Sequence, residues 1–531
     1  MRTRTAFGAL IPGLALILAA SLGLSSTAGA AANDRGAQQP SAAQARQALS
    51  DARAALSGTP GKPTRDATLA LRDLHQALPD LGAADRRAGQ SILSRPTDPG
   101  DDDQYSVASE MLCGTNICLH WVESSGDAVA LTDTSPADGI PDYVNLVLQT
   151  MEGVHSTYIG AGYKPPKPDG ALGGSTKIDV YLANIGTEGL YGYCASDEPV
   201  VAEQYDYWTY CVLDNDYSPT EFPGPVTPTG NMQVTAAHEY FHAVQGAYDW
   251  WEDAWLMEAT ATWAEDELFD DVDDNVFYLP AGQLGVPNAP LDGFFDFGNS
   301  YGNWIFFRWL TEQIPAEAGG MPTLVRQIWQ NADSTNGVAN DQYSLQAVSN
   351  ALADEGYPFP AAYADFATVN RQPRAFYEEG AANGYPAAPL SFKPIVLTPA
   401  KSQTTWGSVN QYHLTNDTAR FVPSKKMKAK SWKLKVQVDM APKVRGSAAV
   451  VTVFFKGGKT GIKPIGLNSQ GDGSVKVPFS SSAVTKVELT LINASERTTC
   501  WAAGQGDPWY SCLGVPQDDN LKQKLRGVAS R

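Results

Sequence analysis

Hydrophobic residues recur every three to four positions in several parts of the chain, and this spacing predicts amphipathic helices. The predicted helices cover residues 45–56, 68–78, 143–158, 234–245, 255–268, 301–314 and 321–332. A period of two over 177–183 predicts a strand among them. Residues 104–390 therefore mix helices and strands in the manner of an α+β domain.

After residue 390 the pattern changes to short β-rich runs separated by Gly, Asn, Ser and Pro. Clear examples cover residues 432–438, 448–455 and 484–492. Such spacing is typical of an all-β sandwich. The sequence thus predicts an α+β domain followed by an all-β sandwich-like domain over 391–531.

The amino terminus has the pattern of a secretory signal peptide over residues 1–32. Arg2 and Arg4 precede an apolar run over 6–24, and small residues follow it. A membrane span is the alternative, but Pro12 interrupts the run, and no later stretch is apolar enough to cross a bilayer. We therefore expect an exported, extracellular protein without an integral membrane span.

Six cysteines lie in three close pairs along the chain, which predicts three local disulfides in an exported protein. The pairs are Cys113 with Cys118, Cys194 with Cys211, and Cys500 with Cys512. A cysteine-rich metal site is the alternative, but no CxxC spacing supports it.

Charge is distributed unevenly over a chain whose formal net charge is −19. An acidic balance of this size argues against a nucleic-acid partner. Residues 231–300 contain 14 Asp or Glu and no Lys or Arg, whereas 391–531 contain 21 basic and 8 acidic residues. The basic C-terminal domain could bind an anionic cell-wall polymer.

The strongest chemical signal is the segment from His238 to His242 on a predicted helix. Histidines four residues apart lie on one helix face, so both rings can bind one tetrahedral Zn²⁺. Glu239 follows the first histidine, where its carboxylate can reach a water molecule at the metal. The alternative is a chance pair on a solvated or core face, but only six histidines occur in the whole chain.

A catalytic zinc needs a third protein ligand and an open fourth position. Glu258 is the candidate, because it lies on the next predicted helix, 16 residues after His242. Glu265, seven residues further, could accept the outward N–H of a ligand histidine, or it could be a surface charge.

These residues resemble the gluzincin peptidases, and the resemblance covers most of the chain. The carrying motifs are His-Glu-Tyr-Phe-His at 238–242 and Trp-Leu-Met-Glu-Ala-Thr-Ala-Thr-Trp-Ala-Glu-Asp at 255–266. More narrowly, Asp-Gly-Ile-Pro-Asp-Tyr-Val at 138–144 is similar to an element of exported bacterial proteins that are classed by inference as metalloproteases. The resemblance implies a zincin-like catalytic domain over 104–390, with His238, His242 and Glu258 as zinc ligands and Glu239 as the base.

One departure from the familiar gluzincins concerns the neighbours of Glu258. Met257 and Ala259 stand where those enzymes have Asn or a similar residue and Gly. A contact from that Asn to the substrate backbone is therefore not expected here, while the metal ligand is unaffected.

The ligand set predicts hydrolysis in which Glu239 takes a proton from water and delivers it to the leaving amine. Tyr301 is the candidate donor to the developing oxyanion, with a packed structural tyrosine as the alternative. His120, His155 and His413 are weaker candidates and are each expected to be structural.

Calcium is a further expectation for the loop that contains Asp133, Asp138 and Asp142, since hard cations bind several oxygens near a tight Gly turn. Its irregular spacing also fits a loop without a metal. The acidic cluster over 270–274 is expected to be a solvated loop.

Residues 33–103 contain no cysteine and no Phe, Trp or Tyr, and they predict a helical N-terminal segment or pro-region. Residues near 96–103 have the pattern of a linker. Because they offer no thiolate, any inhibition by them is expected to be steric. The predicted function is a secreted zinc endopeptidase. The alternatives are a wall-associated binding protein with a structural or vestigial zinc site, and a zinc hydrolase acting on a non-peptide amide or ester.

Overall fold

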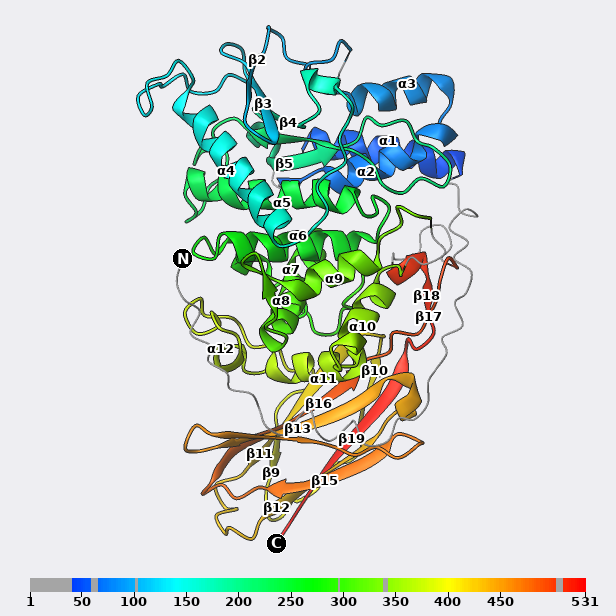
Figure 1. The fold of residues 1–531 in the computed structure, drawn as a ribbon. Helices are drawn as coiled ribbons and strands as arrows, with labels where there is room; N and C mark the ends of the chain where they lie inside the picture. Colours follow the sequence, from blue (N-terminus) through cyan, green and yellow to red (C-terminus); the bar gives the residue numbers. More distant parts are fainter. Residues whose placement is uncertain (1–40, 59–64, 101–103, 295–296, 338–341, 503–509) are drawn as a thin grey trace.

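The structure of this chain is a computed structural model, shown as a ribbon in Figure 1. It describes residues 41–58, 65–100, 104–294, 297–337, 342–502 and 510–531. An α+β unit forms one end of the molecule and an all-β unit forms the other (Figure 1). The predicted order of fold classes is confirmed, while the predicted signal peptide over 1–32 lies outside the described residues.

A six-stranded sheet organises the α+β unit, with the strand order β1-β5-β6-β4-β3-β2. Strand β4 lies between β3 and β6 and pairs with both in parallel. Strand β5 is antiparallel to β6 and parallel to β1. The strands are β1 Arg65–Asp66, β2 Glu110–Cys113, β3 Ile117–Trp121, β4 Ile178–Ala183, β5 Leu190–Ala195 and β6 Tyr210–Asp214. The strand predicted at 177–183 is therefore β4.

Helices cover both faces of this sheet, so β3 and β6 are buried along their whole length. On β4, Val180 and Leu182 join the core formed with α4 (Asp142–Gly160) and α5 (Pro228–Gly246). Tyr181, which points the other way, joins a second core formed with the N-terminal helices. These are α1 Ala42–Leu56, α2 Thr68–Ala77 and α3 Ala83–Ile92. The N-terminal segment is thus packed onto the sheet and shares its core with it.

The remaining helices of the α+β unit follow the sheet in the chain and pack below α5 in Figure 1. They are α6 Ala254–Leu268, α7 Phe297–Gly302, α8 Trp304–Gln313, α9 Thr323–Asn331, α10 Leu345–Asp354, α11 Phe359–Val369 and α12 Pro373–Phe376. The helix predicted over 301–314 is divided into α7 and α8 at Asn303. The Asn303 side chain bonds the backbone of Gln283 and Leu291, which fixes this break.

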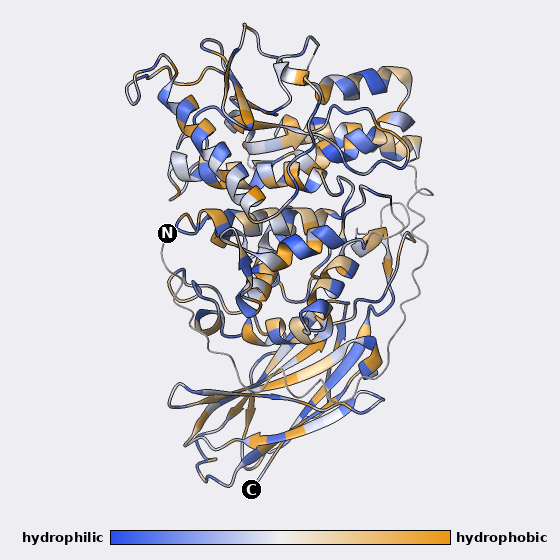
Figure 2. Cartoon of the chain, viewed as in Figure 1, coloured by the Kyte–Doolittle hydropathy of each residue, from blue (hydrophilic) through white to orange (hydrophobic). Residues whose placement is uncertain are grey.

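Two sheets form the C-terminal unit, with the orders β10-β19-β12-β15 and β14-β13-β16-β11-β9. Their strands are β9 Ile395–Leu397, β10 Gly407–Gln411, β11 Thr415–Pro423, β12 Lys433–Asp439, β13 Ser447–Phe455, β14 Thr460–Pro464, β15 Asp472–Pro478, β16 Val484–Asn493 and β19 Leu521–Ser530. Side chains from both sheets share one apolar core. Figure 2 shows hydrophobic and hydrophilic residues alternating along these strands, as expected for a sandwich.

The three predicted disulfides are all present, at Cys113–Cys118, Cys194–Cys211 and Cys500–Cys512. The first two each join neighbouring strands of the six-stranded sheet. Within the described ranges, no helix has both the length and the apolar character that a membrane crossing requires.

The two units are joined by buried polar contacts. Arg371, at the end of α11, pairs with Glu488 on β16 at 2.9 Å. His413 lies between Asp292 and Asp519, at 2.8 Å and 2.7 Å. The chain after β16 returns to the α+β unit, where β17 (Thr498–Thr499) and β18 (Val515–Pro516) lie beside α10 in Figure 1. The predicted boundary near residue 390 remains a prediction.

Candidate metal centre

Helices α5 and α6 pack against each other in the centre of the α+β unit and carry most of the candidate residues. Helix α5 begins at Thr227, whose hydroxyl caps the helix by accepting a hydrogen bond from the Gly230 N–H, with Pro228 in the first turn. Nearly every residue of α5 after Gly230 is buried. A buried helix places its polar side chains in a water-poor environment, where they need specific partners.

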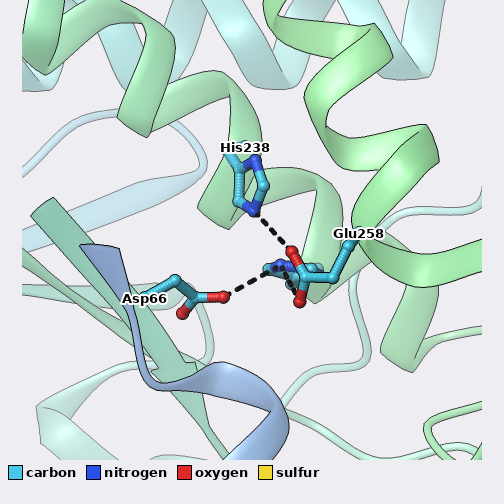
Figure 3. Close-up of side chains that lie close together, drawn as sticks. Asp66, His238 and Glu258 are labelled. Atoms are coloured by element: carbon cyan, nitrogen blue, oxygen red, sulfur yellow. Dashed lines mark ion pairs between the residues drawn. The ribbon is translucent and has the colours of Figure 1, made fainter. Parts of the chain in front are cut away.

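His238 and His242 on α5 meet Glu258 on α6, as the spacing predicted. The Nε2 atom of His238 lies 3.3 Å from one carboxylate oxygen of Glu258, and Nε2 of His242 lies 3.8 Å from the other. Figure 3 shows the Glu258 carboxylate pointing toward the His238 ring, with Asp66 approaching from another element. These four residues each offer a ligand atom, and the four atoms lie within 4.8 Å of one another.

The ligand atoms of the three predicted residues have no hydrogen-bond partner within the described structure. Both Nε2 atoms and both oxygens of Glu258 are buried without such a partner. Unpaired buried polar atoms are costly, and four of them facing one point are best satisfied by a cation. This cluster can therefore hold a metal ion.

A second ring of contacts fixes the two imidazoles. Nδ1 of His238 lies 2.6 Å from Oε1 of Glu265, and Nδ1 of His242 lies 2.7 Å from Oε1 of Gln245. Gln245 in turn donates to the Met257 carbonyl on α6. Each Nδ1–H is therefore a donor, which leaves each Nε2 lone pair facing the cluster. Glu265 was anticipated, whereas Gln245 was missed, although its position three residues after His242 is a usable signal.

Glu239 lies beside the cluster but outside the group of ligand atoms. Strand β5 approaches it closely at Gly192, where any Cβ would lie 2.8 Å from Cγ of Glu239. The Glu239 carboxylate accepts a hydrogen bond from the Thr68 hydroxyl at 3.1 Å. Burial and the nearby Asp66 carboxylate raise the pKa of Glu239 well above its usual range.

Tyr301, the candidate oxyanion donor from the sequence, also lies at the cluster. Its ring stacks on the His238 ring with a centroid distance of 5.3 Å and an interplanar angle of 6°. Its hydroxyl donates to Oδ2 of Asp66 at 3.3 Å. Tyr301 thus has a buried hydroxyl next to the potential ligand atoms.

Asp66 is a potential ligand that the sequence did not indicate. It belongs to β1, and no motif surrounds it; only the pairing of β1 with β5 brings it to the cluster. Its Oδ2 lies 3.8 Å from Nε2 of His242. Burial, followed by repulsion from Glu258, raises its pKa to about 7. The expectation that any inhibition by residues 33–103 is steric stays a prediction.

The ligand residues have divergent acid–base properties in the absence of a cation. Burial lowers the pKa of His242 to about 4. Burial acts in the same direction on His238, but Glu258 and Glu265 outweigh it and raise its pKa well above the usual range. Burial would raise the pKa of Glu258, yet the two histidines hold it below its ordinary value. Without a cation these directions favour an ionised Glu258 and a neutral His242, whereas His238 is held in its protonated form, so metal binding there would release a proton.

A small pocket reaches the cluster from one side. Its empty volume, which includes space open to solvent, is about 270 Å³. It is lined by Asp66, Tyr191, Val234, Thr235, His238, Glu239, Glu265, Asp274, Tyr278 and Tyr301. The acidic loop over 270–274 therefore contributes one of its members to the pocket wall.

The calcium expectation for Asp133, Asp138 and Asp142 is not supported. Backbone N–H groups donate to all three carboxylates, which accounts for them as loop-capping groups. The three do not form one of the close groups of metal-ligating atoms found among the described residues. Asp214, Asp216 and Glu221 do form such a close group, which was not predicted from the sequence. Asp214 accepts hydrogen bonds from three backbone N–H groups.

The three weaker histidine candidates all lie away from the metal cluster. His120 bonds Asp179 at 2.8 Å and stacks on Tyr181. His155 bonds the Tyr240 hydroxyl, and His413 bonds two aspartates between the units. Each has a structural partner, as expected.

Comparisons with known proteins do not identify a family for this chain. No protein-family model matches it, and no curated protein matches it. Among solved structures, one match is to a family GH115 4-O-methyl-α-glucuronidase, BtGH115A, with specificity for decorated arabinogalactans. The identity is 9%, the match covers 56% of this chain and 38% of that chain, and the TM-score is 0.13. A likeness this low carries no argument about fold or function.

Proposed function

We propose that this chain is a secreted zinc-dependent peptidase of the gluzincin type. The carrying observation is the convergence of His238, His242 and Glu258 from two packed helices, with four buried ligand atoms that have no other partner within the described structure. Nitrogen and carboxylate donors in this number suit zinc. Export is supported by the signal-like amino terminus and by three disulfides.

The dimensions of the cluster fit a tetrahedral zinc site. Zinc–ligand bonds of about 2.0–2.1 Å place neighbouring ligand atoms about 3.3 Å apart. The histidine–glutamate distances of 3.3 Å and 3.8 Å, which end at the two different oxygens of Glu258, are of this order. Bound zinc would make water more acidic and polarise the scissile carbonyl.

The side chains around the cluster have complementary roles in this proposal. Glu239 accepts the proton of the attacking water and passes it to the leaving amine. Tyr301, whose ring lies flat on His238, donates its hydroxyl hydrogen to the developing oxyanion. Glu265 and Gln245 hold the two imidazoles in the tautomer that faces the metal.

Hydrolysis of a peptide library tests the proposal. The full chain is tested as wild type and as Asp66→Asn, in which the side chain 3.8 Å from His242 carries no charge. Both versions are loaded with zinc and incubated with casein and with mixed peptides. Cleavage should stop on chelation and return with zinc. Glu239→Gln should retain the zinc and lose activity by roughly 10²–10⁴-fold, the usual contribution of a general base.

A matched control is Asp270→Asn, an exposed carboxylate on the loop after the same helix pair, which should retain full activity. Equal cleavage with and without chelator would refute the zinc mechanism. One bound zinc without turnover on any peptide, in either version of the chain, would favour the alternative of a binding protein. Turnover of esters or other amides alone would favour a non-peptide hydrolase.

The C-terminal unit supports a second, compatible role in attachment to an anionic polymer. On one sheet, the residues that face away from the core include a group of lysines and one arginine on three adjacent strands. They are Lys433, Lys435, Lys476, Lys522, Lys524 and Arg526. Binding of the full chain to a polyanionic wall polymer should weaken with salt and with charge reversal at Lys435 and Lys476.

A further inference from the structure

The N-terminal segment reaches the metal cluster and supplies a side chain that α5 and α6 do not. We propose that Asp66 is a fourth metal ligand, and that it closes the coordination position that hydrolysis requires. The chain described here would then be a latent form. This inference rests on the proposed zinc peptidase and deepens it.

The position of the Asp66 carboxylate is that of a ligand. Its Oδ2 lies 3.8 Å from Nε2 of His242, the same distance that separates His242 from Glu258. Its other oxygen accepts the Thr68 N–H at 2.7 Å, which fixes the orientation of the carboxylate. Asp66 is only 3% exposed, so the carboxylate is directed into a dry site. Three ligands plus this carboxylate give the closed four-ligand set of a site without a free position.

The backbone around Asp66 also covers the edge of strand β5, which a peptide substrate would need. Strand β1 adds to the free edge of β5 in parallel, with Asp66 opposite Gly192. The edge of a sheet beside an active site is where an extended peptide can add by main-chain hydrogen bonds. Gly192 also lies against Glu239, so this edge borders the proposed base. The segment therefore blocks the edge and the metal together.

The chain from Asp66 to Thr68, called here the Asp66 turn, also contacts the proposed base, Glu239, directly. The Thr68 hydroxyl donates to Oε2 of Glu239 and accepts the Cys194 N–H of β5 at 2.9 Å. The N-terminal segment therefore holds the Glu239 carboxylate in place through this bond. Asp66 and Thr68, two residues apart, thus contact the ligands, the base and the edge strand.

The segment is anchored by buried charges on either side of this turn. Arg72 on α2 donates to the Glu252 carbonyl at 2.7 Å, close to the start of α6. Arg95, after α3, pairs with three carboxylates of the α+β unit, at Asp169, Asp179 and Asp197. Latency of this kind would persist until the turn is displaced.

A permanent structural metal site is the competing explanation for four protein ligands. The two explanations differ in what happens when Asp66 is removed. A structural site loses the metal, whereas a latent catalytic site keeps three ligands and gains an open position.

The experiment compares cobalt-substituted full-length wild type, Asp66→Ala and Asp66→Asn by their visible absorption and by titration with acetohydroxamate. Asp66→Asn preserves the shape of the side chain, which guards against misfolding of the alanine variant. Asp51→Asn, on the exposed side of α1 in the same segment, is the matched control. We expect both Asp66 variants to retain one metal ion and to bind acetohydroxamate at least tenfold more tightly than wild type, with a changed spectrum.

Peptide hydrolysis is measured in parallel on the zinc forms, where the Asp66 variants should exceed wild type at least tenfold. Loss of the metal from both variants, or equal acetohydroxamate affinity in all forms, would overturn the inference. If the variants open the site but cleave no peptide, the ligand role stands and the proposed peptidase function fails. If wild type and variants cleave equally, latency fails and the peptidase remains.

Discussion

Replacement of Glu265 by glutamine tests how much the hydrogen bond to the ligand His238 contributes to metal affinity. The Glu265 carboxylate lies 2.6 Å from Nδ1 of His238, and both side chains are almost completely buried. The partner of His242 is already a neutral amide, that of Gln245, at 2.7 Å. Glu265→Gln therefore gives His238 the kind of partner that His242 has, without changing the shape of the site.

The expected magnitude follows from this comparison. Charge-assisted hydrogen bonds are about twice as strong as neutral ones, and loss of an outer contact of this type typically costs roughly 10–100-fold in metal affinity. An amide still accepts the Nδ1–H, so Glu265→Gln should weaken zinc binding about tenfold, or about 1.4 kcal/mol. Glu265→Ala leaves a buried donor without this acceptor and should approach 100-fold.

Competition with a chromophoric chelator measures these dissociation constants for wild type and both variants. Asp270→Asn, an exposed carboxylate after the same helix, should leave the affinity unchanged. Zinc affinities within twofold of wild type for folded Glu265→Gln and Glu265→Ala would refute the reasoning, because the carboxylate would then not orient the ligand.

Two further predictions concern the chemistry of the site and the junction of the two units. Tyr301→Phe should bind zinc normally and lower kcat by roughly 10²–10³-fold, as expected for removal of an oxyanion donor; an unchanged kcat in steady-state assays would leave Tyr301 as a packing residue. For His413, burial would lower the pKa, but Asp292 and Asp519 outweigh it and raise the pKa to about 9. A pKa raised above the unfolded value of about 6.5 stabilises the fold fully below that pH and progressively less as pH rises through 9. The thermal stability of wild type relative to His413→Gln, followed by calorimetry, should therefore fall between pH 6.5 and 9, by up to about 3 kcal/mol; a constant difference over this range would contradict it.

The parts of the site that local spacing controls were predictable from the sequence. A separation of four residues brings His238 and His242 to one helix face in any regular helix, and Glu258 needed only a second helix packed on the first. The helix periodicities were confirmed for the same reason, since burial on one face leaves a repeating pattern. The close spacing of the cysteines likewise gave the disulfide pairs.

Contacts that depend on tertiary pairing could not be predicted in this way. Asp66 is 172 residues before His238 and reaches it only because a two-residue strand pairs with β5. Such a strand leaves no periodic signal. The loop at Asp133 is ambiguous for another reason, because carboxylates near a Gly turn suit backbone capping as well as a cation. Oxygen-rich sequence alone does not separate these uses.

The return of the chain to the α+β unit after β16 has a consequence for protein engineering. Asp253 accepts the Cys512 N–H, and Asp292 accepts bonds from His413 and Ser511. Truncation at residue 390 would remove these donors and leave both carboxylates, near the start of α6, without them. The α+β unit is therefore not a portable module, and a hybrid with another C-terminal unit would have to bring replacements for these donors.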